Sequence, residues 1–178
     1  MPGRAPRPVP TMGLVGWTVR PRRPEQAANL GGPIETVEIL HSKGTTNFDL
    51  VTGAATAIND MLIVMQVLSL VTITTSDCVA PTGTAGTWTQ ATVVGGTQLA
   101  GKAWWRPVTV GGAQTITLTG SGAAVNFGWA YVLRGTNLTA PIEGSGNNAG
   151  SATATHAAPG LTSAVNNGLL IGAWATKA

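Results

Sequence analysis

Residues 98–135 read QLAGKAWWRPVTVGGAQTITLTGSGAAVNFGWAYVLRG, and this stretch decides the fold class. Its pattern predicts strand, turn, strand, loop and strand in the middle of an antiparallel sheet. From residue 127 to 134, large and small apolar side chains alternate with the two-residue period of a strand. Neither face is polar before Arg134, so we expect this strand to be covered on both sides. In residues 114–119, isoleucine and leucine alternate with threonine, which predicts one buried and one wet face.

The rest of the chain after residue 33 also reads as short strands. Residues 61–71 form a nearly continuous apolar run rich in β-branched residues, which favours a central strand over a helix. Glycine pairs at 95–96 and 111–112 separate strand patterns and predict two-residue hairpin turns. Further strand patterns lie at 36–41, 48–51, 88–94, 98–106 and 168–176. We therefore predict an all-β fold, an antiparallel and jelly-roll-like β-sandwich of eight or nine strands, whose last strand forms an edge.

Residues 1–33 differ from this body in composition. They contain seven of the eleven prolines, and because proline neither continues a helix nor donates to a sheet ladder, we expect this segment to form neither. We expect an extended arm over residues 1–33, lying on a neighbouring subunit, and a β-sandwich domain over residues 34–178. A disordered leader is the alternative. The arm residues expected to contact a partner are Arg4, Arg7, Trp17, Arg20, Arg22 and Arg23.

Positive charge is concentrated in the arm. Residues 1–24 hold five arginines and no acid, a charge of +5, whereas the remaining residues hold five basic and seven acidic side chains, a charge of −2. Together these give the formal net charge of +3. A slightly acidic body argues against a nucleic-acid-binding face on the folded domain. Only 10% of the residues are charged, which is typical of a subunit packed against neighbours.

The length and the apolar runs bound the class of protein. A chain of 178 residues is large enough for one well-packed domain and small for two. We expect no secretion signal, since the first residues hold no continuous apolar segment. The run at 61–68 is far shorter than the roughly 20 residues that a membrane-spanning helix takes. Cys78 is the only cysteine, so no internal disulfide can form, and we expect a buried, unreactive thiol.

Residues that could carry chemistry are scattered. His41 and His156 lie far apart in the sequence, and with Cys78 they provide no pair of metal ligands at short spacing. The sequence contains no nucleophile elbow, phosphate-binding loop or dinucleotide-binding loop. A glycosidase pair of carboxylates from distant segments stays open as an alternative, although no acid lies inside a predicted central strand. We expect a protein that is not an enzyme and holds no metal or cofactor.

Two adjacent tryptophans are the candidate ligand contacts. Trp104 and Trp105 must face opposite sides of a strand, so one belongs to the core and the other is left over. The second packs under a loop or a long side chain such as Lys102, or it contributes to an interface or a carbohydrate platform. In the last case the loop at 144–155 would complete the site.

The order of these residues resembles a known β-sandwich domain. Matching features are Trp88-Thr89-Gln90, a Gly-Gly turn, Leu99 through Trp104-Trp105-Arg106, Val108-Thr109, a threonine-alternating strand, the run from Tyr131 to Thr136, and Pro141-Ile142. The 36–41 strand and the Asp60-Met61-Leu62-Ile63-Val64 strand also fit. The pattern is similar to a domain recurrent in virion proteins of tailed bacteriophages, particularly minor tail proteins of phages that infect actinobacteria. The resemblance covers about residues 35–175.

The resemblance implies a non-enzymatic structural component of a virion, present in several copies on a tail or tail tip. The expected partners are other virion proteins and copies of the same chain, and the expected location is the virion, assembled in the host cytoplasm. A capsid decoration protein is one alternative. A glycan-binding or receptor-binding module that recognises host cell-wall sugar is another. The arm and the early end of the chain at residue 178 are not part of the family pattern.

Overall fold

The computed structural model describes residues 11–19, 33–69, 72–83, 86–95, 99–120, 125–147 and 168–176. In these segments the chain forms eleven strands and one 3-10 turn, η2 (Thr75–Asp77), and no α-helix. The strands are β1 (Thr11–Val19), β2 (Glu35–Gly44), β3 (Asn47–Val51), β4 (Met61–Ser69), β5 (Thr82–Gly83), β6 (Thr89–Gly95), β7 (Leu99–Pro107), β8 (Thr115–Thr119), β9 (Val125–Arg134), β10 (Ile142–Asn147) and β11 (Leu169–Thr176). The predicted all-β, antiparallel sandwich is confirmed.

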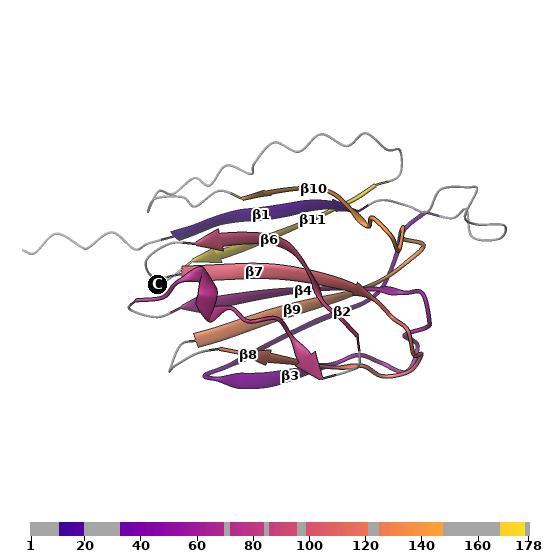
Figure 1. The fold of residues 1–178 in the computed structure, drawn as a ribbon, viewed down its shortest axis with the longest axis horizontal. Helices are drawn as coiled ribbons and strands as arrows, with labels where there is room; N and C mark the ends of the chain where they lie inside the picture. The colour runs from indigo at the N-terminus through magenta and orange to yellow at the C-terminus, as the bar shows by residue number, and fades with distance from the viewer. Residues whose placement is uncertain are drawn as a thin grey trace, which may run out of the picture.

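The strands form three sheets. The central sheet has five strands in the order β2-β9-β4-β7-β6, and the two outer sheets have the orders β10-β1-β11 and β3-β8-β5. Figure 1 shows the outer sheets on opposite sides of the central one, with β1, β10 and β11 at the top and β3 and β8 at the bottom. All pairs are antiparallel. Each face of the central sheet is therefore covered, at least in part, by an outer sheet.

β4 is the middle strand of the central sheet, and its burial explains its composition. Residues 61–68 are all buried, as the continuous apolar run predicts. Met61, Ile63 and Met65 pack with residues of β1 and β11 in one core cluster. Leu62 and Val64 pack with residues of β3 and β8 in another. Each such side chain stabilises the fold by about 1.5–3 kcal/mol relative to an exposed one.

β9 is covered unequally, which differs from the prediction for residues 127–134. Its side chains facing the β3-β8-β5 sheet are buried, including Ala130 and Val132. On the other face only Leu133 is fully buried, whereas Phe127 is 37% exposed. The expectation of cover on both sides is therefore wrong for most of this strand. The reason is tertiary, because the β10-β1-β11 sheet lies over β6 and β7.

Residues 98–135 do not form one continuous sheet either. β7 and β9 flank β4 in the central sheet, but β8 pairs with β3 and β5 in an outer sheet. The second glycine pair, at 111–112, consequently connects two layers and is not a hairpin turn. Gly112 adopts a φ of 96°, which glycine reaches without strain. The alternation predicted for β8 is confirmed, since Ile116 and Leu118 are fully buried.

The first glycine pair begins at the end of β6, in the hairpin that joins β6 to β7. β6 and β7 pair antiparallel, and the pair nearest their connection joins Gly95 to Ala100. Gly95 thus belongs to the strand and is not a turn residue, so the predicted hairpin is confirmed and the predicted two-residue turn is wrong. β11 forms an edge of its sheet, as expected for the last strand.

Part of the proline-rich segment is a sheet strand. Thr11–Val19 pairs with both β10 and β11 and forms the middle of that outer sheet. The expectation that residues 1–33 contribute to no ladder is therefore wrong for β1. The physical reason is visible in the sequence, because these nine residues contain no proline. Val19 is fully buried in the core cluster beneath this outer sheet.

A close approach between β9 and the β3-β8-β5 sheet generates a prediction. A methyl group on Gly128 would overlap Cδ1 of Leu118 and lie 2.8 Å from Cζ of Phe48. We expect Gly128→Ala to lower the free energy of unfolding by about 1–3 kcal/mol, since the two layers must separate to admit it. Urea unfolding followed by tryptophan fluorescence measures this loss.

The matched control is Gly111→Ala. The nearest atom to a methyl group at that position is 3.6 Å away, an ordinary contact, so we expect a change within about 0.5 kcal/mol. Equal destabilisation by the two substitutions would show that the spacing between the layers is not set at Gly128.

Candidate functional site

The uncovered part of the central sheet lies on β2 and β9. In the antiparallel register, His41 pairs with Trp129 and Lys43 pairs with Phe127, so these four side chains share one face. Phe127 is 37% exposed, His41 and Lys43 are exposed, and Trp129 is half-buried. Ile39, 56% exposed, continues the same face along β2. An edge strand and its neighbour thus present aromatic, apolar and basic groups to solvent.

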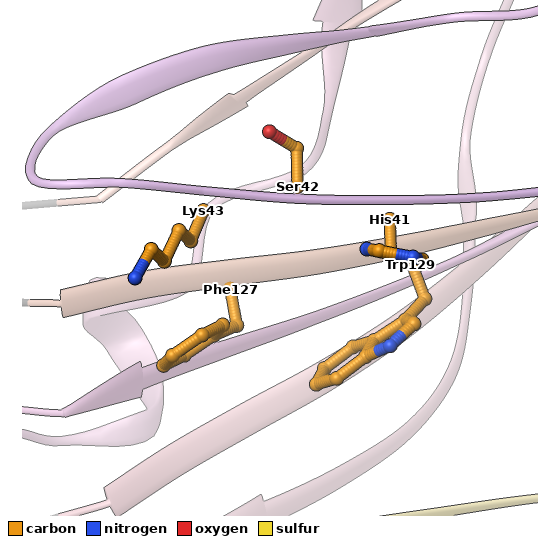
Figure 2. A pocket seen from close by; sticks show the side chains of 5 residues that line it. All are labelled: His41, Ser42, Lys43, Phe127 and Trp129. Atoms are coloured by element: carbon orange, nitrogen blue, oxygen red, sulfur yellow. The ribbon is translucent and has the colours of Figure 1, made fainter.

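A pocket of about 420 Å³ opens on this surface. Its lining consists of His41, Ser42, Lys43, Phe127 and Trp129, and we call it the β2–β9 pocket. Figure 2 shows four of these side chains on one side of the strands, whereas the Ser42 hydroxyl points away from them. Ser42 consequently lines the pocket without directing its hydroxyl group into it.

The two aromatic rings of the pocket lie side by side. Phe127 and Trp129 are two residues apart on β9, so both project from the same face of the strand. Their ring centroids are 6.3 Å apart and their planes differ by 20°. Together they form a flat apolar surface, bordered by the two basic side chains of β2 (Figure 2).

The groups that line the β2–β9 pocket suit the binding of a small ligand. Among the residues that line the pocket there is no Asp or Glu, so no carboxylate neutralises His41 and Lys43 there. The hydroxyl of Ser42 is turned away from His41, which leaves the pocket without a paired nucleophile and base (Figure 2). An aromatic surface with adjacent basic groups can hold a ring-shaped ligand and an anionic group.

The tryptophan pair of β7 lies elsewhere. Trp104 is 3% exposed and packs in a core cluster with Leu68 and Cys78, so its assignment as a surface contact is wrong. Trp105 faces the opposite side, as the strand geometry predicts, and packs half-buried against the core cluster beneath the β10-β1-β11 sheet. Neither lines the β2–β9 pocket. Of the 144–155 loop proposed with them, residues 144–147 belong to β10 and the rest lie outside the described segments.

The predicted partner-binding residues of the arm fall mostly outside the described segments. Trp17 is the exception, since it lies in β1, where its backbone pairs with Ser145 and Ile171. The predicted arm contacts that lie outside the described segments are Arg4, Arg7, Arg20, Arg22 and Arg23. His156, a candidate metal ligand by residue type, also lies outside them.

Part of the β2–β9 pocket could be predicted from the sequence. The alternation in residues 127–134 places Phe127 and Trp129 on one face, and the 36–41 pattern identifies the strand that carries His41. The pairing of β2 with β9 and the absence of cover over them decide that these rings form a site. Both depend on contacts between segments about 90 residues apart.

Asp60 has a structural role at the start of β4. Both of its carboxylate oxygens accept hydrogen bonds from Arg134, each at 2.9 Å, and Oδ2 also accepts from the Ala57 backbone N–H at 2.8 Å. Asp60 is 1% exposed, whereas the Arg134 side chain is 39% exposed. Hydrogen bonding to Asp60 is the main reason that the pKa of Arg134 is raised. In the segments that the structure describes, no group of three His, Cys, Asp or Glu side chains could hold a metal ion.

Comparisons with known proteins identify no relative. No protein-family model, no curated protein and no solved structure matches the chain. Within the described segments, no helix is long and apolar enough to cross a membrane.

Asp60 generates a prediction about stability. We expect Asp60→Asn to lower the free energy of unfolding by about 1–3 kcal/mol, because the amide nitrogen cannot accept the bonds that the carboxylate accepts. Urea unfolding measures the loss. The control Asp49→Asn removes the same charge from an exposed residue that accepts a hydrogen bond from Thr117, and should change stability by less than about 0.5 kcal/mol. Equal effects would contradict a special role for Asp60.

Cys78 generates a prediction about pH. Burial raises the pKa of its thiol from 9.0 to about 12. Below pH 9 the thiol is protonated in both the folded and the unfolded chain, so it adds no pH dependence. Between pH 9 and 12 only the unfolded chain loses the proton, so stability should fall as the pH rises, and Cys78→Ala should remove this contribution. Urea unfolding of both proteins at several alkaline pH values measures it, and identical pH profiles would contradict the prediction.

Proposed function

We propose that the protein is a non-enzymatic structural subunit of a tailed-phage virion, on a minor tail structure or tail tip, anchored to neighbouring subunits through its N-terminal segment. The observation that carries the proposal is the position of β1. This N-terminal strand is the middle strand of an outer sheet, and its two neighbours, β10 and β11, come from the other end of the chain.

Backbone pairing ties the start of the N-terminal segment to the body. A strand in the middle of a sheet forms hydrogen bonds with two neighbours, and β1 forms both sets with β10 and β11 of the same chain. Residues 1–10, which include two arginines, directly precede β1 in the sequence. We propose that these residues extend onto an adjacent virion subunit.

The surface of the body supports repeated packing against neighbours. β10 and β11 are the edges of the outer sheet, and strand edges pair readily with other chains. Leu170 on β11 is 65% exposed, and only 10% of all residues are charged. A capsid decoration protein would need the same kind of surface. Whether the chain is found on the tail or on the capsid of the particle distinguishes these two functions.

Two truncations test the proposal. Deleting residues 1–10 should abolish incorporation into particles and leave the urea-unfolding midpoint unchanged, since β1 stays in place. Deleting residues 1–24 should also lower stability, because it removes β1 and with it Val19 from the core. Each variant is expressed in the host during infection. Mass spectrometry of the purified particles then measures how much of the variant they contain.

The control is the full-length chain with alanine substitutions at five positions within residues 151–167, which leave the sequence of the N-terminal segment unchanged. It should enter particles normally. Normal incorporation of the chain that lacks residues 1–10 would contradict anchoring by the N-terminal segment, and absence of the full chain from particles would contradict the virion role.

A further inference from the structure

We propose that the β2–β9 pocket binds a sugar ring carrying an anionic group, either a carboxylate or a phosphate. This binding activity is additional to the structural role and does not depend on it. Four observations carry it, namely the size of the pocket, its aromatic surface, its two basic side chains and the absence of carboxylates from its lining.

The size of the pocket fits a small ligand. Its volume of about 420 Å³ falls within the range of roughly 300–1,000 Å³ that is usual for small-molecule sites. Five residues from two adjacent strands line it, whereas a stable protein–protein interface takes about 20–30 residues from each partner. The pocket therefore favours one or two rings of a ligand over the surface of another protein.

The aromatic surface favours a ring with one apolar face. Phe127 and Trp129 are nearly parallel, and the face of an aromatic ring carries partial negative charge. A pyranose ring presents weakly positive C–H groups on its face and hydroxyl groups at its rim. It can lie on the aromatic surface with its hydroxyl groups in solvent.

The charges around the pocket favour an anion. His41 and Lys43 border the rings from β2, and no Asp or Glu is among the lining residues. On β2 itself, the Glu38 carboxylate accepts a hydrogen bond from the Gly53 backbone N–H at 2.8 Å. An anionic group beside Lys43 therefore meets positive charge without a competing carboxylate in the lining.

A nucleic acid strand is a weaker candidate for the same pocket. Binding a phosphate backbone takes several basic residues along a groove. The described segments hold four Lys and Arg and six Asp and Glu side chains, a net charge of −2, and only one of these four cations, Lys43, lies at the pocket, together with His41. A sugar with a single anionic group needs no more basic side chains than the pocket provides.

The first experiment compares matched pairs of sugars by isothermal titration calorimetry with the full chain. One pair is a hyaluronan tetrasaccharide and its carboxyl-reduced form, and the other is 6-phosphomaltotetraose and maltotetraose. We expect at least one anionic sugar to bind about tenfold or more tightly than its neutral counterpart. The pair that responds identifies whether the anion is a carboxylate or a phosphate.

Variants of the pocket test where the sugar binds. Phe127→Ala and Trp129→Ala should each weaken binding about tenfold or more. Lys43→Gln should weaken it about threefold in 20 mM salt and less in 500 mM salt, because an exposed charge is screened. Lys102→Gln removes the same charge from β7, outside the pocket, and should leave affinity unchanged. Lys43 is exposed, so its variant tests the site even if an aromatic variant fails to fold.

Several results would overturn the proposal. These are no binding of either anionic sugar at millimolar concentration, equal affinity for neutral and anionic forms, or an unchanged affinity in the Lys43→Gln and Trp129→Ala variants. Tighter binding of a dT12 oligonucleotide would assign the pocket to nucleic acid. A dimer seen by analytical ultracentrifugation and abolished by Trp129→Ala would assign it to a second copy of the chain. Incorporation into particles is a separate measurement, so the two proposals can fail independently.

Discussion

The burial of β4 on both faces is the constraint on which the rest of the structure depends. A sheet covered on one face only would leave one row of the apolar side chains of β4 in water, because successive residues of a strand point to opposite faces. The chain meets this requirement with two outer sheets, one formed by β3, β8 and β5 and the other by β10, β1 and β11. The second of these brings strands from both ends of the chain together. Both faces of β4 are therefore buried only when strands from the two ends of the chain have assembled over it.

Polar groups inside the sandwich fix how the layers meet. Gln66, fully buried on β4, donates hydrogen bonds from Nε2 to the Thr119 carbonyl at 2.9 Å and to Asn126 Oδ1 at 3.0 Å. Asn126 in turn donates to the Thr46 carbonyl at 2.9 Å. These bonds join the central sheet to the outer β3-β8-β5 sheet. Buried amides are costly without partners, so the network favours one register between the layers.

A buried arginine makes a second connection of this kind. Arg106 on β7 is 1% exposed, donates a hydrogen bond from Nη2 to Gln114 Oε1 at 3.1 Å, and lies 5.0 Å from the centre of the Trp88 ring. Burial lowers its pKa, yet a guanidinium stays protonated at neutral pH. Gln114 also donates to the carbonyls of Val110 and Gly112, so the charge helps to order the connection from β7 to β8.

The local patterns of the sequence determined the class of structure and the elements of the body. The apolar run of β4, the threonine alternation of β8 and the hairpin of β6 and β7 could all be predicted, because each depends on side chains only a few residues apart. Only the tertiary structure decided which strands share a sheet and which faces stay open. It placed β8 in an outer layer, β1 between β10 and β11, and Phe127 and Trp129 beside His41 and Lys43. The physical reason is that a two-residue period tells which side chains share a face, whereas the cover of that face depends on contacts between distant segments.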